Sequence, residues 1–294
     1  MRHFDYEKVD SLKEAFDAVS ASQGGAVFMA GGTDLLVQIK EGKIRPQRVI
    51  DVKGIPEMDG LSVPGDELSI GSLTTIRTLE TSPVACEKGA LLAQAAARLG
   101  SVQVRNRATI GGNLCNASPS AEMAPALLAL DAQAEVYGKT GTRTIGMDEF
   151  FRGPGVTNLG DGEILTSLKI PLAPKRQGSV YYKLSARNAM DLAFVSVAVL
   201  IGLDGDEKIA KARVALGAVA PTPIRVPSVE KLLEGHVLSA EILLESAELA
   251  AQACQPISDL RASANYRGEM VKNLCRQGLL SAYRQAKTLT EVDE

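Results

Sequence analysis

Apolar positions in the first part of the chain recur at two different spacings. Behind Ser11 and Glu14, which have the spacing of a capping box, apolar residues follow at helical intervals and predict a helix. The short apolar run Ala26–Ala30 and the segment Arg48–Val52, with three apolar residues of high strand propensity, are typical of strands. Residues 1–55 are therefore predicted to form a small α/β unit.

The segment from 56 to 173 continues this mixture of strands and helices. Glu163–Pro171 alternates apolar and polar residues up to a closing proline, the pattern of a half-buried strand. The other expected elements are strands at Leu68–Gly71 and Ala134–Tyr137 and helices at Thr75–Leu79, Gly89–Leu99 and Ala124–Leu130. Thr109–Ala121, rich in glycine and small polar residues, is predicted to be a loop. We take 56–173 as a second α/β unit.

A third unit, 178–287, is expected beyond a linker at Pro174–Gly178. Its first half holds three strand-like runs at Val180–Leu184, Phe194–Leu203 and Ile209–Ala218. The turn residues Asp204–Asp206 join the last two runs as a hairpin. From Ser228 to Lys287 the pattern is helical. The predicted fold is α+β, with a two-part α/β region followed by a three-stranded antiparallel sheet and helices.

Composition and charge narrow the function classes. The chain has 294 residues, 45% of them hydrophobic, and a net charge of −3, so it lacks the excess of cations that a nucleic-acid-binding surface needs. The longest apolar run, Leu192–Leu203, is too short to span a membrane. There is no targeting signal and no CxxC pair among four cysteines, so a reduced cytoplasmic protein is expected. Two isolated histidines predict neither a metal site nor a covalently attached flavin.

The first candidate site is the glycine pair Gly31–Gly32. It follows an apolar strand and precedes a helix-forming run, and it leaves backbone N–H groups free to approach phosphate oxygens. Thr33 adds a hydroxyl donor. The spacing is neither GxGxxG nor a P-loop, and a lone glycine pair is more often an ordinary turn.

The second candidate site is the Thr109–Ala121 segment with its own glycine pair, Gly111–Gly112. Small residues with many donors suit a loop that wraps a polar ligand, and the carboxylate of Glu122 suits a sugar hydroxyl. A long surface loop is the plain alternative. Together the two glycine pairs favour a diphosphate-bridged dinucleotide, which needs backbone donors from more than one place.

These residues also carry a resemblance to a known family. Phe28–Leu35 and Thr109–Asn113 resemble the paired signatures of the FAD-binding medium subunit of molybdenum hydroxylases, a family that includes xanthine dehydrogenase and aerobic carbon monoxide dehydrogenase. The resemblance covers nearly the whole chain. Further segments in family order are Phe4–Tyr6, Ile70–Ile76, Gly162–Leu165, Tyr182–Leu184 and Asp259–Arg267.

The resemblance implies a PCMH-type FAD-binding region and a role for individual residues. Phe28, Met29, Ala30, Gly31, Gly32, Thr33, Asp34 and Leu35 would hold the FAD diphosphate, and Thr109, Ile110, Gly111, Gly112 and Asn113 would lie along the cofactor. Glu122, where the family usually has aspartate, would bind sugar or ribityl hydroxyls. Leu99, Leu165 and Lys183 match further flavin-contacting positions, although Leu99 and Leu165 are equally good core residues and Lys183 could be an exposed strand lysine.

The resemblance also implies a place in an electron relay. A large subunit would carry the molybdenum cofactor and a small subunit two [2Fe–2S] clusters, and the three chains are expected to assemble as a dimer of heterotrimers. FAD in this chain would pass electrons on to NAD⁺ or another acceptor, with no catalytic acid or base from the protein. Two alternatives stay open: a self-contained flavin oxidase of the same fold, and a non-redox module for an adenine dinucleotide.

Overall fold

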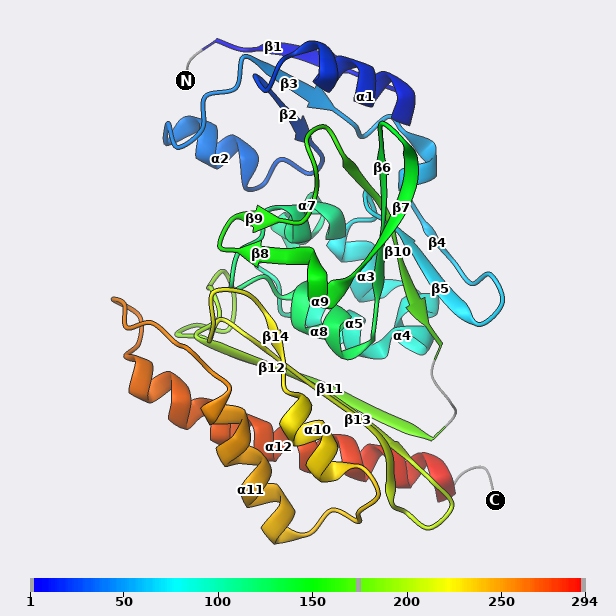
Figure 1. Ribbon diagram of the computed structural model, residues 1–294, viewed down its shortest axis with the longest axis vertical. Helices are drawn as coiled ribbons and strands as arrows, with labels where there is room; N and C mark the ends of the chain where they lie inside the picture. The colour runs from blue at the N-terminus through cyan, green and yellow to red at the C-terminus, as the bar shows by residue number, and fades with distance from the viewer. Residues whose placement is uncertain (1–2, 173–175, 292–294) are drawn as a thin grey trace.

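The computed structural model describes residues 3–172 and 176–291, which form three larger sheets with their helices, one after another along the chain, and one two-stranded sheet (Figure 1). Pro174 and Lys175 of the predicted linker lie outside the described residues. Each of the three segments predicted from the sequence contains one of the larger sheets. The α+β architecture expected from the sequence is confirmed.

The first sheet is parallel, in the order β1 (Asp5–Lys8), β3 (Arg48–Asp51), β2 (Ala26–Met29). Its central strand is the most buried, with Val49 and Ile50 fully inside. The predicted first helix is α1 (Leu12–Ala21), and its N-terminus is capped as expected, because Ser11 Oγ accepts the N–H of Glu14. A short helix, α2 (Leu35–Lys40), follows β2.

The second sheet is antiparallel, in the order β4-β5-β10-β6-β7. Its strands are β4 (Leu61–Ser62), β5 (Glu67–Gly71), β10 (Ile164–Pro171), β6 (Gln133–Gly138) and β7 (Gly141–Gly146). The helices of this region are η1 (Pro56–Met58), α3 (Ile76–Thr81), α4 (Pro83–Lys88), α5 (Ala90–Ala97), α6 (Val102–Arg105), α7 (Ile110–Cys115), α8 (Met123–Ala129) and α9 (Met147–Phe150). A small hairpin of β8 (Phe151–Gly153) and β9 (Val156–Thr157) completes it.

One sequence prediction in this region is wrong. Thr109–Ala121 is not a continuous loop, since its first half forms α7. Thr109 caps this helix, with its Oγ1 accepting the N–H of Gly112 at 3.1 Å. Ile110 and Leu114, one turn apart, are both fully buried. Burial of this apolar pair and the cap outweigh the low helix propensity of two glycines, on which the loop prediction rested.

The third sheet is antiparallel and has the three predicted strands, β11 (Gln177–Leu184), β12 (Val195–Leu203) and β13 (Ile209–Gly217). A fourth strand of two residues, β14 (Ile224–Arg225), joins its edge. The predicted helical stretch consists of three helices, α10 (Pro227–Leu233), α11 (Ala240–Gln252) and α12 (Ala264–Glu291). Residues of β11, β12 and β13 alternate between two cores, one shared with α5 and α8 and one shared with α12 (Figure 1).

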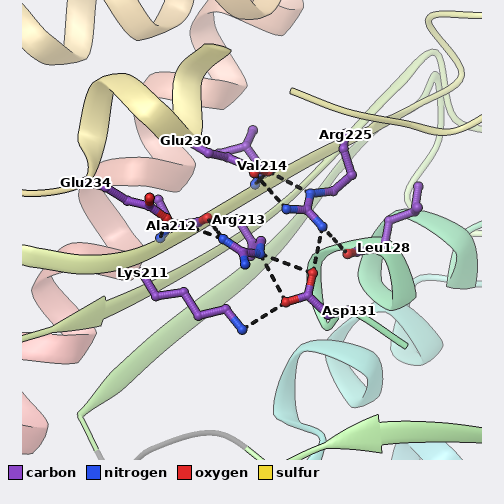
Figure 2. Close-up of polar contacts among 9 residues, drawn as sticks. All are labelled: Leu128, Asp131, Lys211, Ala212, Arg213, Val214, Arg225, Glu230 and Glu234. Atoms are coloured by element: carbon purple, nitrogen blue, oxygen red, sulfur yellow. Dashed lines mark hydrogen bonds and ion pairs between the residues drawn. The ribbon is translucent and has the colours of Figure 1, made fainter. Parts of the chain in front are cut away.

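An ion-pair network joins the turn after α8 to this third sheet (Figure 2). The Asp131 carboxylate forms ion pairs with Lys211 at 2.9 Å, Arg213 at 3.1 Å and Arg225 at 2.7 Å. Arg225 also donates to Leu128 O at 3.1 Å and pairs with Glu230 at 2.7 Å. Its guanidinium therefore links the end of α8 to β14 and α10.

Candidate functional site

The first glycine segment offers a row of unused backbone donors. Gly31, Gly32, Thr33 and Asp34 connect β2 to α2, and their N–H groups make no hydrogen bond within the described residues. Gly32 has φ +74°, a conformation that residues with a Cβ rarely adopt. Successive free N–H groups in a tight turn form a concave site for an anion.

The strand that leads into this row is unusually open for its composition. All four residues of β2, which include Phe28 and Met29, are only partly buried, and so are Ala30 and Leu35. β2 lies at the edge of its sheet. Apolar side chains beside free polar donors suit a ligand with an aromatic or aliphatic part and an anionic part.

The second glycine segment has no such row of unused donors at its glycine pair. The N–H of Ile110 bonds Thr74 O at 3.1 Å and that of Gly111 bonds Ser72 O at 2.8 Å, while Thr109 holds Gly112. A Cβ on Gly111 would lie 2.7 Å from Ser72 Cβ, so this glycine is needed for packing. Asn113 uses its Oδ1 to accept the N–H of Met123, which leaves its amide N–H groups for another partner.

The two glycine segments meet directly. A Cβ on Gly31 would lie 2.1 Å from Arg107 O, so the backbone ahead of Thr109 crosses against the first segment. Gln38 in α2 also donates to Asn116 Oδ1 at 2.9 Å. The structure thus brings both predicted segments to one place, with donors from the first and a packing surface from the second.

Glu122 and Lys183 form a buried ion pair between the second and third sheets. Lys183 Nζ lies 2.7 Å from Glu122 Oε1, and the two side chains are 5% and 7% exposed. The ammonium also donates to Arg98 O at 3.1 Å and to Asp191 O at 2.7 Å, so its three N–H groups are all used within the chain. Lys183 is therefore not the exposed strand lysine that the sequence left open.

The electrostatics of this pair are unusual for a carboxylate next to a lysine. Burial raises the pKa of Glu122, the charge and hydrogen bond of Lys183 only partly oppose this, and the negative charge of Asp34 adds to the rise. The row of free donors is linked to Glu122 by packing contacts, because Gly31 lies against Arg107 O and the Asn113 side chain accepts the N–H of Met123, the residue after Glu122. A buried carboxyl with a raised pKa beside anion-binding donors is typical of a functional site.

Leu99 and Leu165 are placed differently from the polar candidates. They are 6% and 3% exposed and belong to the hydrophobic core of the second sheet. Leu165 lies at the point where the register between β10 and β6 shifts. Both leucines therefore pack in the core, and a contact of either with a flavin stays a prediction.

Sequence reasoning missed Gln94, which bonds the strand that carries Lys183 to helix α5. Its side-chain amide donates to Ser179 O and accepts the N–H of Tyr181, both at 3.0 Å, along the edge strand β11 that carries Lys183. Gln94 is the one polar residue of Leu91–Ala97 in the apolar helix α5. A lone amide in an alanine-rich helix was the available signal.

Two negative findings concern the described part of the chain. Within residues 3–172 and 176–291, no helix is long and apolar enough to cross a membrane. Over the same ranges, no cluster of histidine, cysteine, aspartate and glutamate side chains could hold a metal ion.

The fold and the site together define a dinucleotide-binding α/β region joined to an antiparallel sheet with helices. Comparison with protein families makes this specific: the model "FAD binding domain in molybdopterin dehydrogenase" matches residues 2–173, and "CO dehydrogenase flavoprotein C-terminal domain" matches residues 180–282. The chain belongs to the family of FAD-binding subunits of the molybdenum hydroxylases, which are oxidoreductases.

Individual relatives align with this chain along almost their full length. The xanthine dehydrogenase FAD-binding subunit of Escherichia coli O157:H7 is 31% identical, with 96% of each chain covered. The nicotine 6-hydroxylase medium subunit of Paenarthrobacter nicotinovorans is 33% identical, over 94% of this chain and 96% of the relative. Among solved structures, the carbon monoxide dehydrogenase of Hydrogenophaga pseudoflava superposes with a TM-score of 0.94 at 31% identity, over 97% of this chain and 98% of the other.

Proposed function

We propose that this chain is the flavin station of a molybdenum hydroxylase complex and binds FAD at the junction of its two glycine segments. The observation that carries the proposal is the row of four free backbone N–H groups at residues 31–34, which contacts of Arg107 and Asn113 connect to the start of α8 and the buried Glu122. Such a row matches a diphosphate, and the half-open apolar strand beside it matches the rest of an extended dinucleotide.

The residues of the site would contact different parts of FAD. Gly31, Gly32, Thr33 and Asp34 would hold the diphosphate through their N–H groups. Thr109–Asn113 would lie along the cofactor as a rigid wall, with the Asn113 amide as a donor. Glu122 would accept hydroxyl hydrogens, and Lys183 would fix the position of that carboxylate. Bound FAD supplies the electron transfer chemistry, because it accepts and releases electrons singly or in pairs.

The names of the relatives support partner subunits for this chain. Several relatives are named medium chains or medium subunits, among them those of nicotine 6-hydroxylase and carbon monoxide dehydrogenase. We propose a large subunit with the molybdenum cofactor and a small subunit with [2Fe–2S] clusters for this chain as well, assembled as a dimer of heterotrimers in the cytoplasm. NAD⁺ is the proposed acceptor of the electrons. The segments 1–55, 56–173 and 178–287 are the proposed domains, supported by one sheet of three or more strands in each.

Amide NMR on the deuterated full chain tests the diphosphate site. Addition of FAD should shift the amide resonances of residues 31–34 strongly downfield, because those N–H groups gain an acceptor. The amides of residues 110–112 serve as internal control, since they are already bonded and should shift much less. Equal shifts in both segments, or none at 31–34, would show that the diphosphate lies elsewhere.

Purification from the native source tests the relay. We expect co-purification with two further subunits, with molybdenum, iron and FAD in the complex. A chain that turns over substrate alone would instead establish the self-contained oxidase. A colourless protein that binds an adenine dinucleotide without bleachable flavin bands would establish the non-redox module.

A further inference from the structure

Arg267, in the first turn of α12, is a buried arginine whose guanidinium joins three separate loops. It is 2% exposed. One terminal nitrogen, Nη1, donates to both Phe194 O and Ala218 O at 3.0 Å, and the other, Nη2, donates to Asp259 Oδ1 at 3.0 Å. Its Nε has no hydrogen-bond partner within the described residues. A buried cation with an unsatisfied donor is costly, and such a group in a native structure calls for an explanation.

Two of these loops touch the polypeptide that leads into Glu122. Ala218 N–H donates to Pro119 O at 2.8 Å. The Ser120 hydroxyl donates to Ala193 O at 3.4 Å, next to Phe194. The segment Ser118–Ala121, which precedes Glu122, is thus attached to Ala218, whose carbonyl Arg267 holds, and to Ala193, the residue before Phe194.

The backbone at this attachment is strained and closely packed. Ala218 has φ +65° and Ala117 has φ +47°, both in the left-handed region that alanine rarely adopts. A Cβ on the preceding Gly217 would lie 2.5 Å from Ser196 Oγ and 2.8 Å from Pro125 Cγ, which fixes the backbone position there. Strained residues persist where surrounding contacts determine their conformation, and they are frequent at ligand sites.

We infer that Arg267 is a positioning residue for the FAD site: it holds Ala218 in its left-handed conformation so that the segment Ser118–Ala121 places Glu122 beside the cofactor. The Ala218 N–H points at Pro119 O while its C=O accepts from Arg267, so one strained residue transmits the contact. Asp259 fixes the guanidinium and is itself held by the backbone N–H groups of Arg261 and Ala262. The inference rests on the proposed FAD site.

Titration of the full-length chain with FAD, followed by flavin fluorescence, tests this role. Arg267→Met keeps the side-chain length and removes all three contacts, and we expect the FAD dissociation constant to rise roughly tenfold in protein that is still folded by circular dichroism. Arg225→Met is the matched control, because Arg225 also bonds carboxylates and a backbone carbonyl, but at the end of α8 far from Glu122. That variant should lose thermal stability but keep its dissociation constant within about twofold.

A second variant separates positioning from general loosening. Glycine adopts the left-handed conformation without strain, so Ala218→Gly added to Arg267→Met should recover at least about threefold of the lost affinity. Should Arg267→Met fail to fold, Arg267→Lys keeps the charge but not the planar fork, and it should weaken FAD binding roughly threefold.

The results distinguish a positioning role of Arg267 from a purely structural one. If Arg267→Met binds FAD as the unchanged chain does, or if Arg225→Met weakens binding equally, Arg267 is only structural and the inference is wrong. Absence of recovery with Ala218→Gly overturns the role of the strained residue. If the unchanged chain binds no FAD, the proposed function itself fails, whatever the variants do.

Discussion

The two ends of helix α8 are both fastened to the third sheet by ion pairs, but the two fastenings differ in kind. At the N-terminal end, Glu122 meets one cation, Lys183, and both are at most 7% exposed. At the C-terminal end, Asp131 is 30% exposed and meets three cations, Lys211, Arg213 and Arg225 (Figure 2). One helix therefore carries a dry pair and a solvated network about two turns apart.

The pKa values of the two carboxyls move in opposite directions. Burial raises the pKa of Glu122 and Lys183 does not fully compensate. Burial also opposes ionisation of Asp131, but Lys211, Arg213 and Arg225 outweigh it and hold the pKa below its ordinary value. The Asp131 network thus serves attachment, whereas the Glu122 pair keeps a carboxyl in a state that a polar ligand could change.

Removal of one cation at each end of α8 should give the largest difference in the free energy of unfolding. Lys183→Met leaves Glu122 buried and unpaired and breaks the bonds to Arg98 O and Asp191 O, so we expect a loss of about 3 kcal/mol in the free energy of unfolding. Lys211→Met leaves Asp131 with two arginines and should cost less than about 1 kcal/mol. Urea denaturation measures both. Similar losses would mean that the two ends do not differ in kind.

The same pair shows how far sequence reasoning reaches. Period and turn residues predicted the strands of the third sheet and the first helix, because those signals are local. Glu122 and Lys183 were both predicted as site residues, but their contact spans 61 positions along the chain, which no local pattern encodes. Family resemblance supplied the residues, and only the fold supplied the distance between them.

The second glycine segment shows the opposite limit. Gly111–Gly112 looked equivalent to Gly31–Gly32 in the sequence, yet one pair packs inside a helix start and the other presents free donors. The difference lies in Thr74 O and Ser72 O, acceptors from a distant turn that use the N–H groups of Ile110 and Gly111. Which N–H groups remain free depends on tertiary packing, so composition could not reveal it.

A smaller effect is expected from Asp131 itself. Asp131→Asn keeps the shape and removes the charge that three cations share, and we expect a loss of between about 1 and 2 kcal/mol in the free energy of unfolding. Salt should weaken the unchanged network and leave the variant less affected, because half-exposed pairs are screened. Urea denaturation at low and high ionic strength measures this. A variant as salt-sensitive as the unchanged chain would assign the salt effect to other charges.

The most specific effect is on the pH dependence of stability, because the two ends should respond to pH with opposite signs. Glu122 has a raised folded pKa, so the folded state binds more protons than the unfolded state just above the ordinary glutamate value of about 4.3, and stability falls as pH rises through that window. Asp131 has a lowered folded pKa, so stability falls as pH drops below the ordinary aspartate value of about 3.9.

Urea denaturation of the unchanged chain, Glu122→Gln and Asp131→Asn between about pH 3 and pH 7 isolates the two contributions. Subtraction of each variant curve removes all other titrating groups, which leaves a contribution from Glu122 that falls as pH rises and a contribution from Asp131 that increases as pH rises. Glutamine and asparagine preserve the shape of the replaced side chains, so packing changes are small. Two slopes of the same sign would mean that Lys183 stabilises Glu122 as fully as the three cations stabilise Asp131, and the distinction between the two ends of α8 would fall.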